Sequence, residues 1–171
     1  LCKVIRYQSA ADAGEQPSEQ GVGAHRDTGF ITFVHQDAVG GLQVERDGRL
    51  VDVPVVPGTL VVNIGEMFQL ATRGYFKATV HRVVAPLPGV ERISVAYFFN
   101  PKLEATLSPI SLAPELAAEA PGGESADSTN PILANYGDNS LKVRLRAHPD
   151  VAEVHHADLL ASGRWASQAA V

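Results

Sequence analysis

The feature that most restricts the fold is the way Gly and Pro divide residues 1–108 into short runs rich in Val, Ile, Phe and Thr. Such runs between turn residues are typical of short β-strands. No stretch between them is suited to a crossover helix, so the strands are predicted to be antiparallel, in a barrel or jelly roll. The expected strands are 3–7, 30–35, 41–45, 50–53, 59–64, 79–85 and 93–99, with an Asp47-Gly48 hairpin turn and one short helix at 66–72.

The composition changes after this region. Residues 111–131 are rich in Ala, Pro, Gly, Ser and Glu and have too little apolar surface to order strongly, so we expect a linker. Beyond it, Asp138 and Asp150 are candidate helix caps. The pattern from Leu141 to Leu145 fits a helix or, because apolar and basic residues alternate there, a strand.

Charge and cysteine content exclude several classes of function. The 14 Lys and Arg against 19 Asp and Glu give a net charge of −5, which favours neither a nucleic acid nor a membrane partner. The single cysteine, Cys2, excludes intrachain disulfides and zinc sites built from three or four thiolates. No apolar run approaches the roughly 20 residues of a membrane span. We therefore expect a cytoplasmic protein.

A metal site is the most specific chemical prediction. His25 and Asp27 stand two positions apart, which on a strand places both side chains on one face, and His81 supplies a second imidazole farther along the chain. Two histidines and one carboxylate leave three positions of a metal open, as in non-haem Fe(II) oxygenases. A 2-oxo acid can fill two of these positions and dioxygen the third.

A carboxylate receptor is predicted beside this site. Arg92 and Ser94 also stand two positions apart, within an apolar strand, and a guanidinium with a neighbouring hydroxyl suits a buried carboxylate. A second His-x-Asp pattern, His148-Pro149-Asp150, is better explained by helix capping.

Five motifs, in order and suitably spaced between about Val4 and Ile110, resemble the isopenicillin N synthase-like family of Fe(II)- and 2-oxoglutarate-dependent oxygenases. They are His25-Arg26-Asp27-Thr28-Gly29, Gly40-Gly41-Leu42-Gln43-Val44, Asn63-Ile64-Gly65-Glu66, Phe76 through Val83 with His81, and Arg92-Ile93-Ser94 through Pro101.

The resemblance implies a mainly β protein, a double-stranded β-helix or jelly roll with a C-terminal helical segment. It implies iron at His25, Asp27 and His81, and the distal carboxylate of 2-oxoglutarate at Arg92 and Ser94. The cofactors would be Fe(II), 2-oxoglutarate as co-substrate, and dioxygen. The expected organisation is a jelly-roll core at 1–110, a linker at 111–131 and a helical tail at 132–171.

Further positions carry over from the resemblance. Tyr7 matches a tyrosine that hydrogen-bonds the co-substrate or substrate. Phe98, Asn63 and Gln43 match positions that line the substrate pocket or lie near the metal.

The expected activity is a dioxygenase that hydroxylates, desaturates or cyclises a small organic substrate while 2-oxoglutarate is converted to succinate. Ile5 stands where members that use 2-oxoglutarate often have Asn. An isopenicillin N synthase-like or aminocyclopropanecarboxylate oxidase-like enzyme, which uses no 2-oxo acid and holds the substrate carboxylate with Arg92 and Ser94, is therefore the alternative. A non-catalytic metal-binding barrel fragment is a second alternative.

Against the family, the chain begins just ahead of the strand that carries Tyr7, so an N-terminal part of the family fold is expected to be absent. The sequence then predicts exposed apolar surface or an unpaired strand edge on that side, and association through it.

Overall fold

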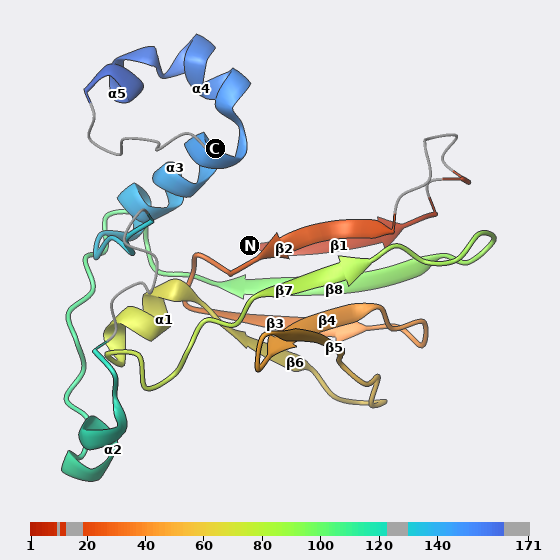
Figure 1. Cartoon of the computed structure of the whole chain (residues 1–171), viewed down its shortest axis with the longest axis horizontal. Coiled ribbons are helices and arrows are strands. Elements are labelled where there is room, and N and C mark those ends of the chain that lie inside the picture. The colour runs from red at the N-terminus through yellow and green to blue at the C-terminus, as the bar shows by residue number, and fades with distance from the viewer. Residues whose placement is uncertain (10, 13–18, 123–129, 163–171) are drawn as a thin grey trace. The chain divides into compact units, whose positions relative to one another are not determined.

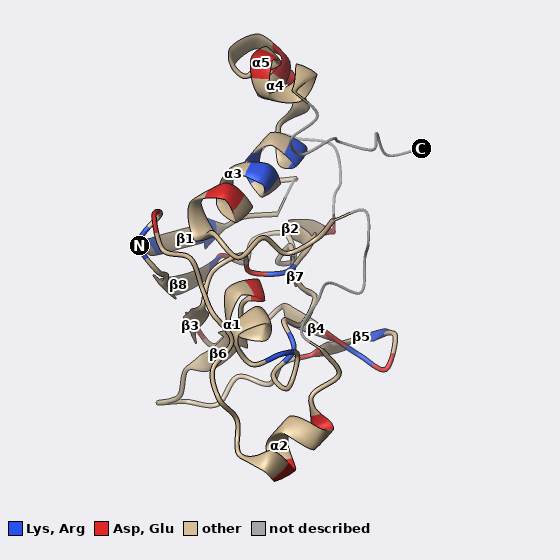
Figure 2. Ribbon diagram, turned by 90° about the vertical axis from the view of Figure 1, so that its left-hand side faces the viewer, with Lys and Arg blue, Asp and Glu red and all other residues tan. Residues whose placement is uncertain are grey.

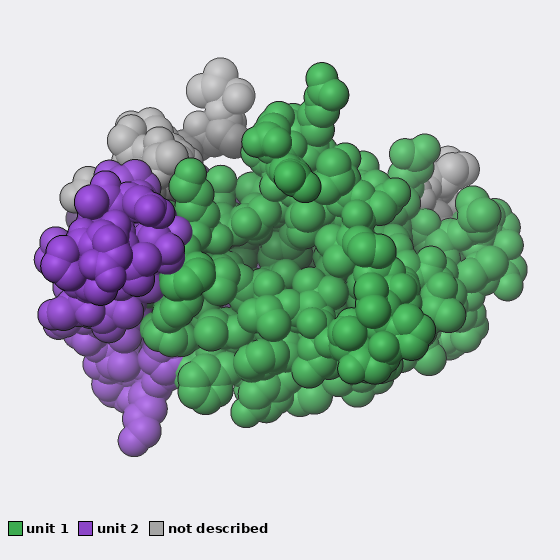
Figure 3. All heavy atoms as spheres, turned by 90° about the horizontal axis from the view of Figure 1, so that it is seen from below, with its two compact units in different colours: residues 1–69, 76–100 green, residues 70–75, 101–171 purple. Residues whose placement is uncertain are grey.

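In the computed structural model, which describes residues 1–9, 11–12, 19–122 and 130–162, the chain divides into two units (Figure 3). The first unit consists of Leu1–Gln69 and Phe76–Asn100, and the second of Leu70–Tyr75 and Pro101–Val171. The described part of the first unit contains two four-stranded antiparallel sheets (Figure 1). One sheet has the order β1 (Cys2–Tyr7), β8 (Arg92–Phe99), β3 (Ile31–Gln36), β6 (Val61–Ile64). The other has the order β2 (Gln20–His25), β7 (His81–Val84), β4 (Leu42–Arg46), β5 (Arg49–Asp52).

These sheets confirm the mainly β fold and every strand expected from the sequence, within a few residues at the ends. The short helix expected at 66–72 is α1 (Glu66–Ala71). The predicted hairpin joins β4 to β5, and its charged tip is visible in Figure 2. Asp47 and Gly48 both have positive φ values, 52° and 73°. A two-residue hairpin turn whose twist matches that of the flanking strands requires this conformation at both positions.

One strand, β2, was not among those expected. Its sequence, Gln20-Gly21-Val22-Gly23-Ala24-His25, contains two glycines and few strand-forming residues, and its pairing with β7 is interrupted by register shifts. Close packing explains the first glycine, because a β-carbon on Gly21 would lie 3.0 Å from the Tyr7 ring and 3.2 Å from the Val83 carbonyl oxygen.

Alternation along β8 separates the interior of the first unit from its outer face. Arg92, Ser94 and Ala96 are buried, whereas Ile93 and Tyr97 between and beyond them are exposed. The buried side of this sheet contributes Tyr7 to a hydrophobic core completed by Leu42 and Val83 from the other sheet, with partly buried Ile5, Val22, Val53 and Val61 around it.

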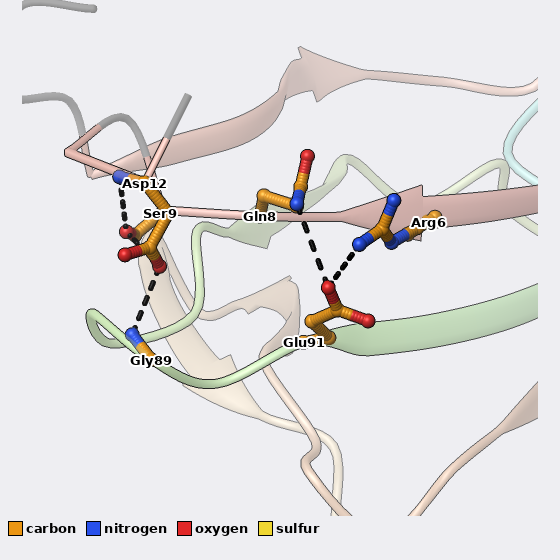
Figure 4. A network of polar contacts seen from close by, with 6 residues as sticks. All are labelled: Arg6, Gln8, Ser9, Asp12, Gly89 and Glu91. Carbon is orange, nitrogen blue, oxygen red and sulfur yellow. Dashed lines mark hydrogen bonds and ion pairs between the residues drawn. The ribbon is translucent and has the colours of Figure 1, made fainter. Parts of the chain in front are cut away.

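A polar network anchors the end of β1 to the turn that leads into β8 (Figure 4). Arg6 pairs with Glu91, and Gln8 donates to the same carboxylate. Asp12 accepts hydrogen bonds from the Ser9 hydroxyl at 2.6 Å and from the Gly89 backbone N–H at 2.9 Å. Arg6 and Glu91 adjoin Tyr7 and Arg92 in sequence, so the network helps to keep these two interior residues opposite each other.

The network also shifts the acidity of its carboxyl groups. The hydrogen bond from Arg6 lowers the pKa of Glu91, and the hydrogen bonds from Ser9 and Gly89 lower the pKa of Asp12.

The second unit contains α2 (Pro114–Glu119), α3 (Tyr136–Ala147), α4 (Pro149–His155) and α5 (Ala157–Ala161). Helix α2 lies within the segment expected as a linker, and α3 confirms a helix where the pattern around Leu141 was ambiguous.

The expected helix caps were wrong. Asn135, not Asp138, caps α3, and its side chain accepts a hydrogen bond from the Asp138 backbone N–H at 3.0 Å. Asp150 lies in the first turn of α4, where the cap residue His148 makes no side-chain capping bond. The carboxylate of Asp150 still stabilises α4, because a negative charge in the first turn of a helix interacts favourably with the helix dipole.

Among the described residues, no helix combines the length and the apolar character needed to cross a membrane.

Candidate functional site

Two strand ends and one loop bring the predicted metal ligands together. His25 ends β2 and pairs directly across the sheet with His81, the first residue of β7. Asp27 follows β2, and its Oδ1 lies 3.8 Å from Nε2 of each histidine. One candidate ligand atom from each of the three residues lies within 4.8 Å of the others. The structure thus places these residues as a single divalent-metal site requires.

The protonation pattern of the two imidazoles fits this arrangement. Nδ1 of His25 lies 2.8 Å from the Gly23 carbonyl oxygen, and Nδ1 of His81 lies 3.1 Å from the Thr79 carbonyl oxygen. Because a carbonyl oxygen can only accept, each Nδ1 carries the proton and donates it, which leaves the Nε2 lone pair free to bind a metal. Burial lowers the pKa of His81, so the neutral imidazole is favoured.

The carboxylate of Asp27 gives a second indication that a cation fits here. Its side chain is buried, and its Oδ2 has no hydrogen-bond partner in the part of the chain that the structure describes. A buried carboxylate oxygen without a donor is unfavourable unless a ligand satisfies it. The donor set of two imidazoles and one carboxylate is suited to a divalent transition metal with open positions.

The loop that carries Asp27 is clamped against the start of α1. The backbone N–H of Glu66 donates to the Asp27 carbonyl oxygen at 2.8 Å, and that of Met67 donates to the Gly29 carbonyl oxygen at 3.0 Å. The approach is so close that a β-carbon on Gly65 would overlap the Gly29 carbonyl group. This explains why glycine stands at position 65, beside the loop that carries a metal ligand.

Arg92 is buried, with 1% of its surface exposed, and not all of the hydrogen-bond donors of its guanidinium have partners. Its Nε donates to the Gly40 carbonyl oxygen and its Nη2 to Gln36 at 3.3 Å, whereas Nη1 is buried without a hydrogen-bond partner among the described residues. No described acidic side chain pairs with it. The ring of Tyr7 lies 4.7 Å from the guanidinium carbon. A buried guanidinium with a free donor and no counter-charge is a strong indication of an anionic ligand.

The glycine pair before β4 makes this arrangement of Arg92 possible. Gly40 and Gly41 have φ values of 80° and 89°, a conformation that favours glycine. The backbone at these two positions presents the Gly40 carbonyl oxygen to the guanidinium.

One cavity of about 180 Å³ joins the metal ligands to Arg92. Its walls include Tyr7, Asn63, Ser94 and Phe98 of the predicted site. Asn63 also lies near the metal ligands, with its Nδ2 3.5 Å from Nε2 of His81.

Gln43 does not line the cavity, contrary to the expectation from its motif. Strand alternation directs Leu42 inward and Gln43 outward, where it accepts from Arg82 at 2.7 Å and donates to Asp52 at 2.8 Å.

Sequence reasoning missed Lys3 and the mainly apolar residues of the cavity wall, and it also missed Gln36 and Gly40 as hydrogen-bond partners of Arg92. Strand alternation gives a signal for Lys3, because it shares a face with Tyr7, four residues along β1.

The comparisons with known proteins agree with this geometry. The profile of the 2OG-Fe(II) oxygenase superfamily matches residues 1–101. The chain belongs to this superfamily.

Curated relatives include two plant enzymes. The chain is 45% identical over 101 residues to 1-aminocyclopropane-1-carboxylate oxidase 1 of Oryza sativa subsp. japonica, an alignment that covers 58% of this chain and 30% of the relative. It is 46% identical over 92 residues to gibberellin 3-beta-dioxygenase 2-3 of Triticum aestivum, covering 53% and 25%. The chain therefore spans less than a third of the length of either enzyme.

A solved structure extends the match beyond the β-sheets. The dioxygenase for auxin oxidation from rice aligns with a TM-score of 0.63 and 30% identity, covering 85% of this chain and 46% of that one. The superfamily takes its description from oxygenases that depend on Fe(II) and 2-oxoglutarate, and such oxygenases are oxidoreductases.

Proposed function

We propose that the chain carries the active site of a non-haem Fe(II)- and 2-oxoglutarate-dependent dioxygenase that oxidises a small organic molecule and releases succinate. The observation that carries the proposal is that one cavity is lined both by His25, Asp27 and His81 and by Arg92, a buried cation whose Nη1 has no partner among the described residues. Such a cavity matches a metal and a diacid bound side by side.

In this proposal His25, Asp27 and His81 hold the iron. When bound, Fe(II) and 2-oxoglutarate together activate dioxygen for attack on a C–H bond of the substrate. The Gly23 and Thr79 carbonyl oxygens keep both histidines in the tautomer that presents Nε2. The hydrogen bonds between α1 and the loop of Asp27 hold the carboxylate in place.

Arg92 is proposed to bind the distal carboxylate of 2-oxoglutarate through Nη1, with Ser94 as a second donor. Gly40 and Gln36 hold the guanidinium so that it loses little conformational entropy when the anion binds. The ring of Tyr7 covers one face of the guanidinium. Val22, Leu42 and Val83 give the cavity an apolar wall that limits the access of water.

The second candidate is an iron oxidase that takes no 2-oxo acid and binds the carboxylate of its own substrate at Arg92 and Ser94. The similarity to 1-aminocyclopropane-1-carboxylate oxidase favours it, and so does Ile5, which lies opposite Ser94 and offers no polar group to a co-substrate. Formation of succinate from 2-oxoglutarate by the Fe(II)-loaded protein would support the dioxygenase. Consumption of dioxygen without succinate, in the presence of amino acid substrates, would support the oxidase.

A metal-binding experiment tests the ligand assignment and the non-catalytic alternative. The wild type and His35→Ala, which changes an exposed histidine on β3, are expected to bind one Fe(II) per chain, and His81→Ala is expected to bind none. Unchanged affinity in His81→Ala would refute the assignment. Metal binding without any consumption of dioxygen across a substrate panel would favour a non-catalytic barrel.

We propose that the functional organisation follows the core at 1–110, the link at 111–131 and the helical tail at 132–171. In support, every residue that lines the cavity lies between Lys3 and Phe98. The cytoplasmic location and the absence of nucleic acid and membrane partners stay predictions.

Association through the N-terminal side also stays a prediction. Strand β1 is at the edge of its sheet, and exposed Val4, Ile93, Tyr97 and Val62 lie on the outer face of that sheet. Light scattering of the wild type beside Tyr97→Lys would test it, because association through this face predicts a smaller mass for the variant.

A further inference from the structure

The inner face of the sheet that holds Arg92 carries a second cation that the proposed mechanism does not use. Along β1, Lys3, Ile5 and Tyr7 alternate onto the cavity wall, and Tyr7 lies opposite Arg92 while Lys3 lies opposite Ala96. At about 3.3 Å per residue, Lys3 is roughly 13 Å along the strand from Tyr7. The two cations therefore mark opposite ends of the cavity wall.

The position of the Lys3 ammonium group keeps the two ends separate. Its Nζ lies 5.4 Å from the centre of the Phe98 ring, and Phe98 is beyond Ala96, on the side away from Arg92. Arg92 is fixed by Gly40 and Gln36. A five-carbon diacid held at Arg92 is too short to reach the Phe98 end, so it leaves Lys3 without a counter-charge.

Lys3 lines the cavity although its side chain is exposed, and no acidic side chain in the described part of the chain pairs with it. In the described part of the chain its ammonium group makes no ion pair, and its one polar interaction is the contact with Phe98. The neighbouring wall is formed by Ile5, Val34 and Ala96. A cation beside an aromatic ring and small or aliphatic side chains is suited to a ligand with an apolar body and one negative group.

We propose that the substrate is a small carboxylic acid whose carboxylate pairs with Lys3 and whose apolar part lies against Phe98. This inference rests on the proposed function and names the class of its substrate. Lys3 would act as a specificity residue that binds substrate, distinct from the co-substrate contact at Arg92.

The test compares acids with their uncharged analogues in a complex that does not turn over. Protein with Mn(II) in place of Fe(II), and with saturating 2-oxoglutarate, is titrated with phenylacetate, 3-phenylpropionate and hexanoate, each beside its primary amide, and binding is followed by ligand-observed NMR. Because Lys3 is exposed, water weakens the charge pair, and the wild type is expected to prefer at least one acid over its amide by about two- to fivefold.

Three variants assign this preference to the ammonium group. Lys3→Gln is expected to lose the preference for the acid, and Lys3→Arg is expected to keep most of it. Lys77→Gln, a matched loss of charge at an exposed residue outside the cavity lining, is expected to match the wild type. The affinity for 2-oxoglutarate, measured without the acids, is expected to be the same in all four proteins.

Two results would overturn the inference: no acid bound more tightly than its amide by the wild type, or an undiminished preference in Lys3→Gln. Failure of the proposed function has a different signature, because the wild type would then fail to bind 2-oxoglutarate, with or without a bound metal.

Discussion

Replacing Arg92 with Met separates the effect of this residue on stability from its effect on ligand binding. The guanidinium is 1% exposed and lacks a counter-charge among the described residues, so removing its charge relieves a desolvation penalty of several kcal/mol. The same change removes the hydrogen bonds to Gly40 and Gln36, each about 1.5–3 kcal/mol because the donor is charged. These effects oppose each other, and we expect the ligand-free unfolding free energy to change by less than about 2 kcal/mol.

Binding of 2-oxoglutarate is expected to respond far more strongly. Loss of one partner of a buried charge pair weakens binding by about 2–5 kcal/mol, which at 1.4 kcal/mol per factor of ten is at least about 30-fold. At a 2-oxoglutarate concentration 100 times the wild-type Kd, ligand binding stabilises the metal-loaded wild type by about 2.7 kcal/mol. If the Kd rises 100-fold, the same concentration stabilises Arg92→Met by about 0.4 kcal/mol.

The assay is chemical unfolding of the metal-loaded proteins with and without 2-oxoglutarate. Arg82→Met is the matched control, because Arg82 bonds to Gln43, which does not line the cavity. In Arg82→Met we expect 2-oxoglutarate to raise the unfolding free energy by as much as it does in the wild type. An equal increment in Arg92→Met and wild type would refute the reasoning that Arg92 binds the diacid.

Three further predictions concern the supports of the site and the fold. Gly65→Ala is expected to lower the unfolding free energy by about 1–3 kcal/mol or more and to weaken metal binding, because the added β-carbon overlaps the loop that carries Asp27. Gly23→Ala is the control, because the nearest contact of its β-carbon is a flexible glutamine side chain. We expect it to have the smaller effect in both chemical denaturation and metal titration. The pKa of Asp12 is lowered from its ordinary value of 3.8, so the hydrogen bond from Gly89 to its carboxylate is expected to persist at pH values above 3.8 and to be lost only as the pH falls through the lower folded-state pKa. An NMR titration of the Gly89 amide with a midpoint at or above pH 3.8 would contradict this. Asn135→Ala is expected to lower stability by about 0.5–2 kcal/mol through loss of the α3 cap, and Asn135→Asp to restore most of it, as judged by thermal unfolding.

A strand could be predicted where strand-forming residues are frequent and buried and exposed positions alternate along the sequence, as from Arg92 to Phe99. Strand β2 was not, because Gly21 is selected by the close approach of Tyr7, a tertiary contact that leaves no periodic signal. The cap of α3 was misplaced for a similar reason, since Asn135 and Asp138 are both good capping residues and the backbone decides between them.

At the site, side chains were easier to predict than their backbone partners. His25, Asp27 and His81 could be grouped because their donor chemistry points to one metal. The contact of Arg92 with Gly40 could not be foreseen, since it depends on the left-handed conformation of two glycines. Gln43 was assigned to the pocket by its motif, although alternation with Leu42 already favoured the opposite face.

Anaerobic visible spectroscopy of the Fe(II)-loaded protein tests most directly whether the metal ligands and Arg92 form one site for iron and 2-oxoglutarate. Addition of 2-oxoglutarate to the wild type is predicted to produce a charge-transfer absorption band that saturates at one equivalent per iron. In Arg92→Met the band should require a far higher concentration. An iron-loaded wild type that shows no band at any 2-oxoglutarate concentration, or an Arg92→Met protein with the same titration midpoint as wild type, would contradict the account.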